Sequence, residues 1–237
     1  MPAATVGRGR RSQEERSAST QRLLLDAAVD CLVEHGYGAL TTTMVAERAG
    51  VSRGAQLHHY RSRAALVAAA VEHVFAGLTD DYRAAFAALD RAQRTPAAAV
   101  SLLWSMYGQR RHQAILDLYA AARTDEELRA VLLPVAAAHA QNVRTLAAEY
   151  FPHAASDARF HVTLELLLQA MLGMALARCL YGDEGMSPEL VPALEAMATQ
   201  AVADAAAAPA GMPPRPLRET PLPARPRSRS PKKEKPS

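Results

Sequence analysis

Apolar residues recur at helical spacing through most of the chain, and no segment alternates apolar and polar residues for long enough to predict a strand. A first apolar stripe ends near Gly36 and Gly38, and two short helical units follow at 43–49 and 53–60. A long amphipathic helix is expected over 64–89. The first stripe consists of Leu23, Leu24, Ala27, Ala28, Cys31 and Leu32.

Beyond the long helix, the same period continues to about residue 207. One helix is expected over 96–122. Thr124 and Glu127 have the spacing of a capping box, which predicts a short helix that Pro134 interrupts. A further helix is expected to end near Tyr150.

Two helices are predicted to end the folded part. Residues 157–181 form a strongly apolar helix. Ser187 followed by Pro188 supplies an N-cap with proline at the first helical position, which predicts a last helix over 188–207. The pattern therefore predicts an all-α protein of about nine helices.

Charge divides the chain into a mildly acidic body and two basic ends. Residues 1–19 carry a net charge of +2, residues 20–208 carry −5, and residues 209–237 carry +6. The stretch 209–237 is rich in Pro, Arg and Lys and has almost no apolar periodicity, so it cannot bury enough surface to fold and is expected to be disordered. Residues 1–11 resemble it. Basic ends beside an acidic body are typical of a protein that contacts a polyanion. The alternative interpretation is that the two ends are solvated tails without a partner.

Composition narrows the protein class further. No run of about 18 uncharged apolar residues is present, which argues against a membrane span. The first 20 residues lack the apolar centre of a secretion signal. The two cysteines, Cys31 and Cys179, are far apart and lie in apolar helical patterns, which indicates a reducing compartment without disulfides. A cytoplasmic location is therefore expected.

The segment 40–60 has the features of a helix-turn-helix. Thr42 or Thr43 is placed to cap its first short helix. Gly50 can adopt the positive φ of a tight turn, and Val51 can fill the space between the two helices. Ser52 is placed to cap the second helix. The small alanines and glycines around the turn allow the two helices to cross closely.

The second short helix has a base-rich exposed face. Arg53 stands at its start, His58 and His59 follow, and Arg61 and Arg63 come directly after it. Such a helix fits the major groove of DNA with its N-terminal residues towards the base edges. Its peptide dipole also places partial positive charge near phosphates.

The stretch from about Gln21 to Leu66 resembles the N-terminal DNA-binding domain of the TetR family of bacterial transcriptional regulators. The resemblance implies a helix-turn-helix DNA-binding domain over 12–66, followed over 67–208 by a helical domain for ligand sensing and dimerisation. The matching residues are the apolar first helix ending in His35-Gly36-Tyr37, Leu40-Thr41-Thr42, Val45-Ala46, Ala49-Gly50-Val51-Ser52, His59-Tyr60, Arg63 and Leu66.

The resemblance also implies roles for individual residues of the helix-turn-helix. Thr42, His59 and Arg63 are the expected phosphate contacts, and Tyr60 is expected to anchor the second short helix to the core. The residues expected to face bases are Thr43, Arg53, Gly54, Ala55 and His58. Arg53 is the strongest candidate for a sequence-specific contact. Leu57 stands where the family usually has a tyrosine, and Gln56 where it usually has an apolar residue, so the rotation of this helix is open.

The remaining helices are expected to dimerise and to enclose a ligand. The dimer surface is assigned to the helices at 157–181 and 188–207, and in the family two such helices pair with their copies as a four-helix bundle. Ordinary monomer core is the alternative for them. The dimer candidates on the first helix are Phe160, Leu164, Leu167, Leu168, Met171, Leu172, Ala175, Leu176 and Cys179. The ligand-contact candidates are Trp104, Tyr107, Arg111, His112, Tyr119, His139, Asn142 and Gln169.

The function that these features favour is a dimeric transcriptional repressor that binds a pseudo-palindromic operator in double-stranded DNA. A small-molecule effector of largely apolar character would release it from that operator. A nonspecific nucleoid-type DNA-binding protein is the first alternative. A helical enzyme is disfavoured because no phosphate-binding Gly loop, metal-ligand cluster or recognisable nucleophile–base arrangement is present. His58 and His59 are adjacent and point apart on a helix, so no metal site and no cofactor are expected.

Overall fold

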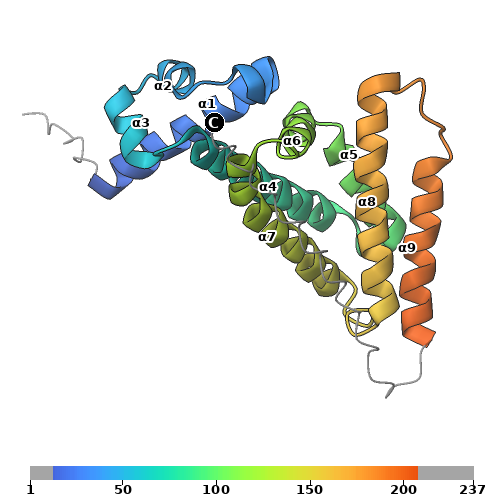
Figure 1. The fold of residues 1–237 in the computed structure, drawn as a ribbon. Coiled ribbons are helices and arrows are strands. Elements are labelled where there is room, and N and C mark those ends of the chain that lie inside the picture. The colour runs from blue at the N-terminus through green and yellow to red at the C-terminus, as the bar shows by residue number, and fades with distance from the viewer. Residues whose placement is uncertain (1–12, 208–237) are drawn as a thin grey trace, which may run out of the picture.

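The computed structural model describes residues 13–207, and the predicted basic arm (1–11) and basic tail (209–237) lie outside that range. Within it the protein has nine α-helices, one short 3₁₀ turn and no strand, which confirms the all-α prediction (Figure 1). The helices are α1 (Gln13–Ala39), α2 (Thr42–Ala49), α3 (Arg53–His59), α4 (Arg63–Ala88), α5 (Pro96–Tyr107), α6 (Arg110–Ala121), α7 (Glu126–Tyr150), α8 (Ala158–Tyr181) and α9 (Leu190–Ala207), with the 3₁₀ turn at Arg91–Gln93.

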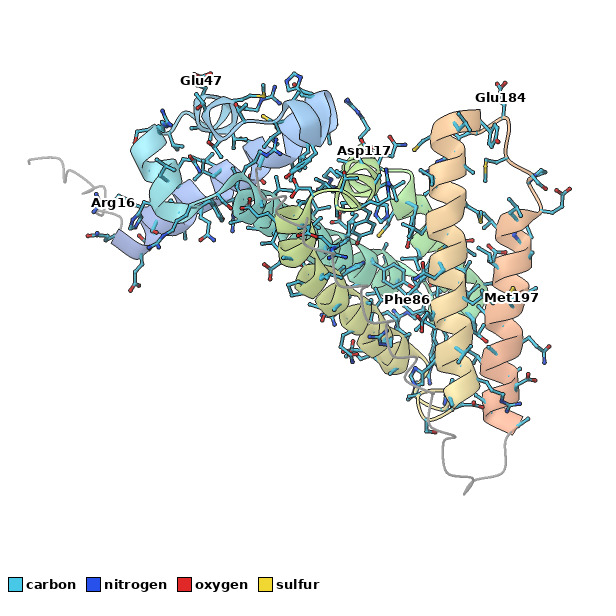
Figure 2. The ribbon with its side chains drawn as sticks, viewed as in Figure 1. Arg16, Glu47, Phe86, Asp117, Glu184 and Met197 are labelled. Carbon is cyan, nitrogen blue, oxygen red and sulfur yellow. The ribbon has the colours of Figure 1, made fainter. Side chains whose placement is uncertain are left out.

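The helices form two units that share one long helix. Helices α1, α2 and α3 gather at one end of the molecule, called the head below, and α8 and α9 stand side by side at the other end (Figure 1). Glu47 of the head and Met197 of α9 mark these two ends in Figure 2. Helix α4 leaves the head and runs into the body, packing against α1 near its start and along α7 further on.

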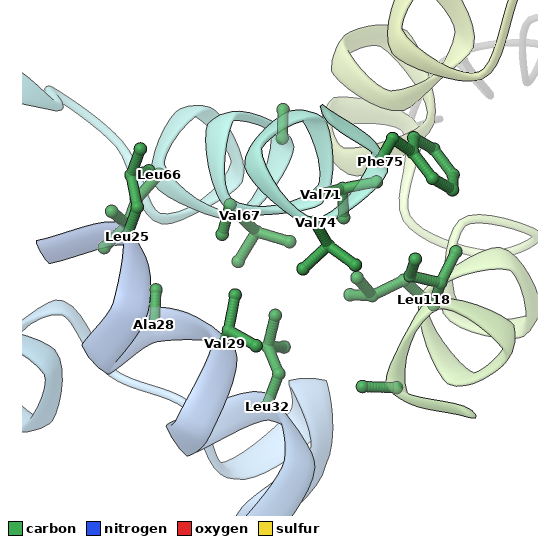
Figure 3. Packing of buried hydrophobic residues seen from close by; sticks show 14 of the residues in the cluster. Leu25, Ala28, Val29, Leu32, Leu66, Val67, Val71, Val74, Phe75 and Leu118 are labelled. Atoms are coloured by element: carbon green, nitrogen blue, oxygen red, sulfur yellow. The ribbon is translucent and has the colours of Figure 1, made fainter. Parts of the chain in front are cut away.

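An apolar seam between α1 and α4 holds the head on its long helix. Leu25, Ala28 and Val29 of α1 face Val67 and neighbouring side chains of α4 (Figure 3). Leu118 of α6 reaches the same cluster and is fully buried. The predicted α1 stripe is buried here except for Leu23, which is 48% exposed and lies outside the core.

The helix expected over 96–122 is instead two helices, α5 and α6, separated at Gly108 and Gln109. Arg178 of α8 contacts the chain at the point where α5 ends. Its guanidinium donates a hydrogen bond to the Tyr107 carbonyl at 2.6 Å and lies 4.7 Å from the Trp104 ring centroid. A distant side chain thus satisfies a helix-terminal carbonyl, which no local pattern predicts.

Pro134 does not interrupt its helix, contrary to the prediction. Helix α7 runs unbroken from Glu126 to Tyr150 with Pro134 inside it. Proline removes one backbone donor and leaves the carbonyl four residues earlier without its helical partner. That carbonyl belongs to Ala130, and both Ala130 and Pro134 are exposed, so water can satisfy it.

Three helix starts differ from the predicted caps. Thr41, rather than Thr42 or Thr43, caps α2 by accepting a hydrogen bond from the Met44 N–H at 3.1 Å. Asp125, rather than Thr124, caps α7. Helix α9 begins at Leu190, because Ser187 bonds the Glu189 carboxylate instead of capping a helix at Pro188.

A hydrogen-bonded junction attaches the head to the body. The Tyr37 hydroxyl at the end of α1 donates to Asp125 Oδ2 at 2.9 Å, while Asp125 Oδ1 accepts from the Leu128 N–H at 2.9 Å. These two bonds lower the pKa of Asp125, the backbone bond first. The guanidinium of Arg63 lies 4.1 Å from the Tyr37 ring centroid and donates to the carbonyls of Tyr37 and Leu40 at 3.3 Å each. One carboxylate therefore joins the start of α7 to the head.

Two histidine side chains lie inside the body, His112 buried and His139 half-buried. His112 is 6% exposed and its ring centroid is 4.1 Å from that of Tyr107, and His139 stacks on Phe75 at 3.8 Å. Burial, with smaller contributions from His139 and Arg178, lowers the pKa of His112 to about 4, and burial lowers the pKa of His139 to about 4. Both rings are therefore neutral at physiological pH. Within residues 13–207 neither Nδ1 atom has a hydrogen-bond partner.

We predict that Tyr37→Phe lowers the free energy of unfolding by about 1 kcal/mol, because the Asp125 bond is lost while the ring contact with Arg63 stays. Asp125→Ala is expected to be more destabilising, since it also removes the α7 cap. Urea unfolding of the two single variants and the double variant measures this. Tyr37→Phe should have little further effect in the Asp125→Ala background, and simple additivity would contradict the junction.

We also predict that acid destabilises the protein through His112. The unfolded chain binds a proton at a pKa near 6.5, whereas the folded ring stays neutral down to about 4, so stability is full above about pH 6.5 and falls as the pH drops towards 4. For His112 alone the loss between about pH 7 and pH 5 is about 2 kcal/mol. His112→Leu should flatten the pH dependence of unfolding, and His153→Leu, at an exposed position, should not. Equal slopes for the two variants would be the contrary result.

Candidate DNA-binding head and ligand cavity

The turn between α2 and α3 has the geometry that the sequence predicts. Gly50 ends α2 with φ 66° and ψ 29°, in the left-handed region that glycine adopts without strain. The Val51 N–H donates to the Ala46 carbonyl at 3.0 Å, which closes the turn. Ser52 caps α3 by accepting from the Ala55 N–H at 3.2 Å. Hydrogen bonds within residues 46–55 thus define the angle at which α3 leaves α2.

Gln56 fixes the rotation of α3. Its side chain is fully buried, and its Nε2 donates to the Tyr60 carbonyl at 2.9 Å, just past the end of the helix. Leu57, one residue further, is 45% exposed. The polar residue that departs from the family pattern thus faces the core and holds the α3 C-terminus. The opposite side of the helix, which carries Arg53, Gly54 and His58, faces solvent.

The predicted DNA-contact residues differ in how far they reach solvent. Thr43, Arg53, Gly54 and His58 are exposed. Those at the edge of this surface are half-buried, namely Thr42, Ala55, His59 and Arg63. Tyr60 is 7% exposed and packs in the core, as an anchoring residue should. The resulting surface places the side chains of Arg53 and His58 on one face of α3.

Arg63 has an internal role besides its expected contact with phosphate. Its guanidinium rests on the Tyr37 ring and donates to the two carbonyls of the junction described above. Arg48 of α2 is engaged similarly, in an ion pair with Glu34 of α1. Neither role follows from sequence spacing, because the partners lie 14 to 26 residues away.

The body contains a cavity of about 110 Å³ between α4, α5, α6, α7, α8 and α9. Aliphatic and aromatic side chains form most of its wall, among them Leu78, Met106, Phe160 and Met171. Polar atoms come from threonine, tyrosine and histidine, and no Asp, Glu, Lys or Arg belongs to the wall. The cavity is therefore suited to an apolar, uncharged molecule with a few polar atoms.

Three of the ligand candidates line this cavity, namely Tyr107, His112 and His139. The other five lie outside its wall. Trp104 supports the Arg178 guanidinium, Arg111 lies 3.8 Å from the Asp81 carboxylate, and Tyr119 packs against the main core. Asn142 and Gln169 are exposed. Helical periodicity predicts which face of a helix carries a residue. It does not predict whether that face lines the cavity, because this depends on neighbouring helices that are distant in sequence. The wall residues Tyr82, Tyr150 and Thr163 were missed for the same reason.

Helix α8 has two apolar faces with different surroundings. Phe160, Leu167, Met171 and Ala175 are buried within the subunit, so these four dimer candidates belong to the monomer core. The outer face carries side chains spaced alternately by four and three residues, all exposed: Val162, Leu166, Gln169, Gly173, Leu176 and Leu180. A Cβ built on Gly173 would meet nothing within 4 Å. By length and composition α8 would also suffice to cross a membrane, but it packs along α9 and lines the cavity.

Comparisons with known proteins agree with the head. Residues 24–70 match the family model described as bacterial regulatory proteins of the tetR family. An HTH-type transcriptional regulator of Mycobacterium tuberculosis is 27% identical over 194 residues, which cover 80% of this chain and 97% of that protein. The HTH-type transcriptional regulator CymR of Pseudomonas putida is 41% identical over 80 residues, or 34% of this chain and 39% of CymR.

Two solved structures share the fold over most of the chain. The multidrug binding protein EbrR, complexed with imidazole, has a TM-score of 0.57 at 24% identity and covers 75% of this chain and 93% of its own. FadR of Bacillus subtilis, in complex with stearoyl-CoA, has a TM-score of 0.55 at 16% identity over 76% of this chain and 97% of its own. The helix-turn-helix head thus matches the tetR family of bacterial regulatory proteins, and the chain as a whole shares its helical fold with these two structures.

Proposed function

We propose that the protein is a sequence-specific DNA-binding transcriptional regulator that acts in the cytoplasm as a homodimeric repressor, released from its operator when a small molecule fills the body cavity. The observation that carries the proposal is the solvent-facing side of α3. It presents Arg53, Gly54 and His58 outwards at the start of a short helix that Ser52 caps and Gln56 fixes. This is the arrangement with which a recognition helix enters the major groove.

Dimerisation is the second part of the proposal. On the outer face of α8, Leu176 is 61% exposed and Leu180 is 75% exposed. A row of large apolar side chains in contact with water is unfavourable for a single subunit and is typical of a protein–protein interface. Spacings of four and three residues match the repeat with which two helices pack in a coiled coil. Gly173 lies within this row and permits close approach. Two copies joined at α8 and α9 would present two α3 helices to the half-sites of a pseudo-palindrome.

The coupling between cavity and head runs through the helices that they share. Leu78 and Thr79 of α4 line the cavity, and the same helix begins in the head at Arg63. His139 of α7 also lines it, and α7 begins at the Asp125 junction with Tyr37. A ligand that fits one spacing of these helices better than another would bias the separation of the two heads and hence operator affinity. EbrR and FadR, which share the fold, are each known in a complex with a small molecule.

We predict that Arg53→Ala relaxes sequence choice. A bidentate contact of arginine with guanine contributes about 1–3 kcal/mol of discrimination, so affinity for the operator should fall about tenfold or more, with a much smaller loss on random DNA. Fluorescence anisotropy at fixed salt measures both affinities, with an operator selected from a random library. Arg91→Ala, on the exposed 3₁₀ turn of the body, is the matched control and should change neither.

Equal losses on operator and random DNA would remove Arg53 from the base-reading surface. A wild-type protein with no preference for any selected sequence over random DNA would replace the proposal with the nonspecific, nucleoid-type alternative.

We predict that Leu176→Arg converts the dimer into a folded monomer, because a buried unpaired charge is strongly unfavourable at an apolar interface. Leu133→Arg on α7 is a close control, since Leu133 and Leu176 are 62% and 61% exposed in the single subunit. Size-exclusion chromatography with light scattering gives the mass, and circular dichroism checks the fold. A dimeric Leu176→Arg variant, or a monomeric wild type, would refute the assigned interface.

A further inference from the structure

The polar atoms of the cavity fall into two groups, those already satisfied by the protein and those left over. The Thr79 hydroxyl donates to the Phe75 carbonyl at 2.8 Å, and the Tyr82 hydroxyl donates to the Ala99 carbonyl at 3.2 Å. By contrast, the Nδ1 atoms of His112 and His139 have no hydrogen-bond partner within residues 13–207. Buried polar atoms in proteins are nearly always paired, so an unpaired one in a cavity wall points to a missing partner.

The two unpaired nitrogens belong to histidines that both line the cavity. The ring of His112, more than nine-tenths buried, is 4.1 Å from that of Tyr107. A neutral imidazole offers one nitrogen that donates and one that accepts. Tyr107 and His112 therefore form a hydrogen-bonding corner of the wall, and His139 lines the same cavity.

The surroundings of this corner disfavour a charged ligand. The wall contains no carboxylate to meet a cation and no lysine or arginine to meet an anion. Arg178 is the cation that acts on His112, but its guanidinium already holds the Tyr107 carbonyl and lies over the Trp104 ring, with its Nε 3.7 Å from the Asp183 carboxylate. An ionised ligand would lose its water without gaining a counter-charge.

Size and shape favour a flat, single-ring molecule. The cavity volume of about 110 Å³ is of the same order as the roughly 150 Å³ of an engineered apolar cavity that holds one benzene, so it suits a guest of about one ring. Aromatic rings from α4, α7 and α8 face it, namely those of Tyr82, Tyr150 and Phe160. Such rings pack well against a planar aromatic guest.

We propose that the effector is a neutral monocyclic aromatic compound with a hydroxyl group, of the phenol class, whose hydroxyl bonds the imidazole of His112. This proposal rests on the proposed function only in treating the body cavity as the effector site. Binding itself can be measured without DNA, so the two stand or fall separately.

The test uses four probes of similar size with the full-length protein at neutral pH: p-cresol, toluene, 4-methylbenzoate and 4-methylbenzylamine. Trp104 is the single tryptophan of the chain, and its ring centroid lies 6.2 Å from that of Tyr107, so its fluorescence reports on this corner. Excitation at the red edge of the tryptophan band avoids absorption by the phenol, and isothermal titration calorimetry provides a second readout.

We expect p-cresol to bind about tenfold more tightly than toluene, as one hydrogen bond to a buried partner would give. The benzoate and the benzylamine should bind at least tenfold more weakly than p-cresol. His112→Leu should abolish the preference for p-cresol over toluene while keeping toluene binding, and His153→Leu, at an exposed position, should leave the preference unchanged. His139→Leu serves in its place if His112→Leu does not fold.

Toluene binding as tightly as p-cresol, or either ion binding as tightly, would overturn the proposal, as would a preference that survives the removal of both imidazoles. If p-cresol binds as expected but leaves operator affinity unchanged, the ligand class stands and ligand-controlled repression falls. If the operator is bound specifically and p-cresol is not bound, the ligand class falls and the DNA-binding function stands.

Discussion

The structure depends on the burial of α4 from more than one side. Near its start the helix packs against α1, and further along it packs against α7. Ala64, Leu66, Val67, Ala68, Ala70, Val71, Val74, Phe75 and Leu78 are buried along it, so almost every turn contributes to a core. A helix held in this way cannot shift at one end without disturbing the packing at the other, because side chains in a close-packed interior have few alternative positions. Helix α4 therefore connects the head to the wall of the cavity through continuous packing.

The head could be predicted from sequence almost residue by residue, because its structure is local. Gly50 and Ser52 act within a few residues of their own positions, and both behave as expected. The N-cap of α2 is Thr41 rather than Thr42 or Thr43, so the prediction of the cap was wrong by one or two positions in a run of three threonines. The roles of Gln56, Arg48 and Arg63 required the structure. A buried glutamine that bonds a carbonyl is indistinguishable in sequence from an exposed one, and the partners of the two arginines are distant in sequence.

The helices of the body could be predicted from the sequence, but the residues that line its cavity could not. The carbonyl at the end of α5 is satisfied by Arg178, which is 71 residues away in sequence. The wall of the cavity is assembled from six helices, and periodicity alone does not say which of two apolar faces meets a neighbour. Helix α8 illustrates this: Met171 and Leu176 are both apolar, yet the first is fully buried in the subunit and the second is 61% exposed. Long-range packing, which the sequence encodes only collectively, makes the difference.

Gln169 gives the outer row of α8 a further consequence. A strict alternation of four and three residues falls short of the natural turn of a helix, so two copies packed along it wind around each other with a left-handed twist. A single amide in an otherwise apolar row favours the one alignment in which it meets a partner amide. A related regulator with a leucine at that position would leave the amide unsatisfied. The same residue that weakens the row would thus disfavour pairing with a partner chain that carries an apolar residue at that position.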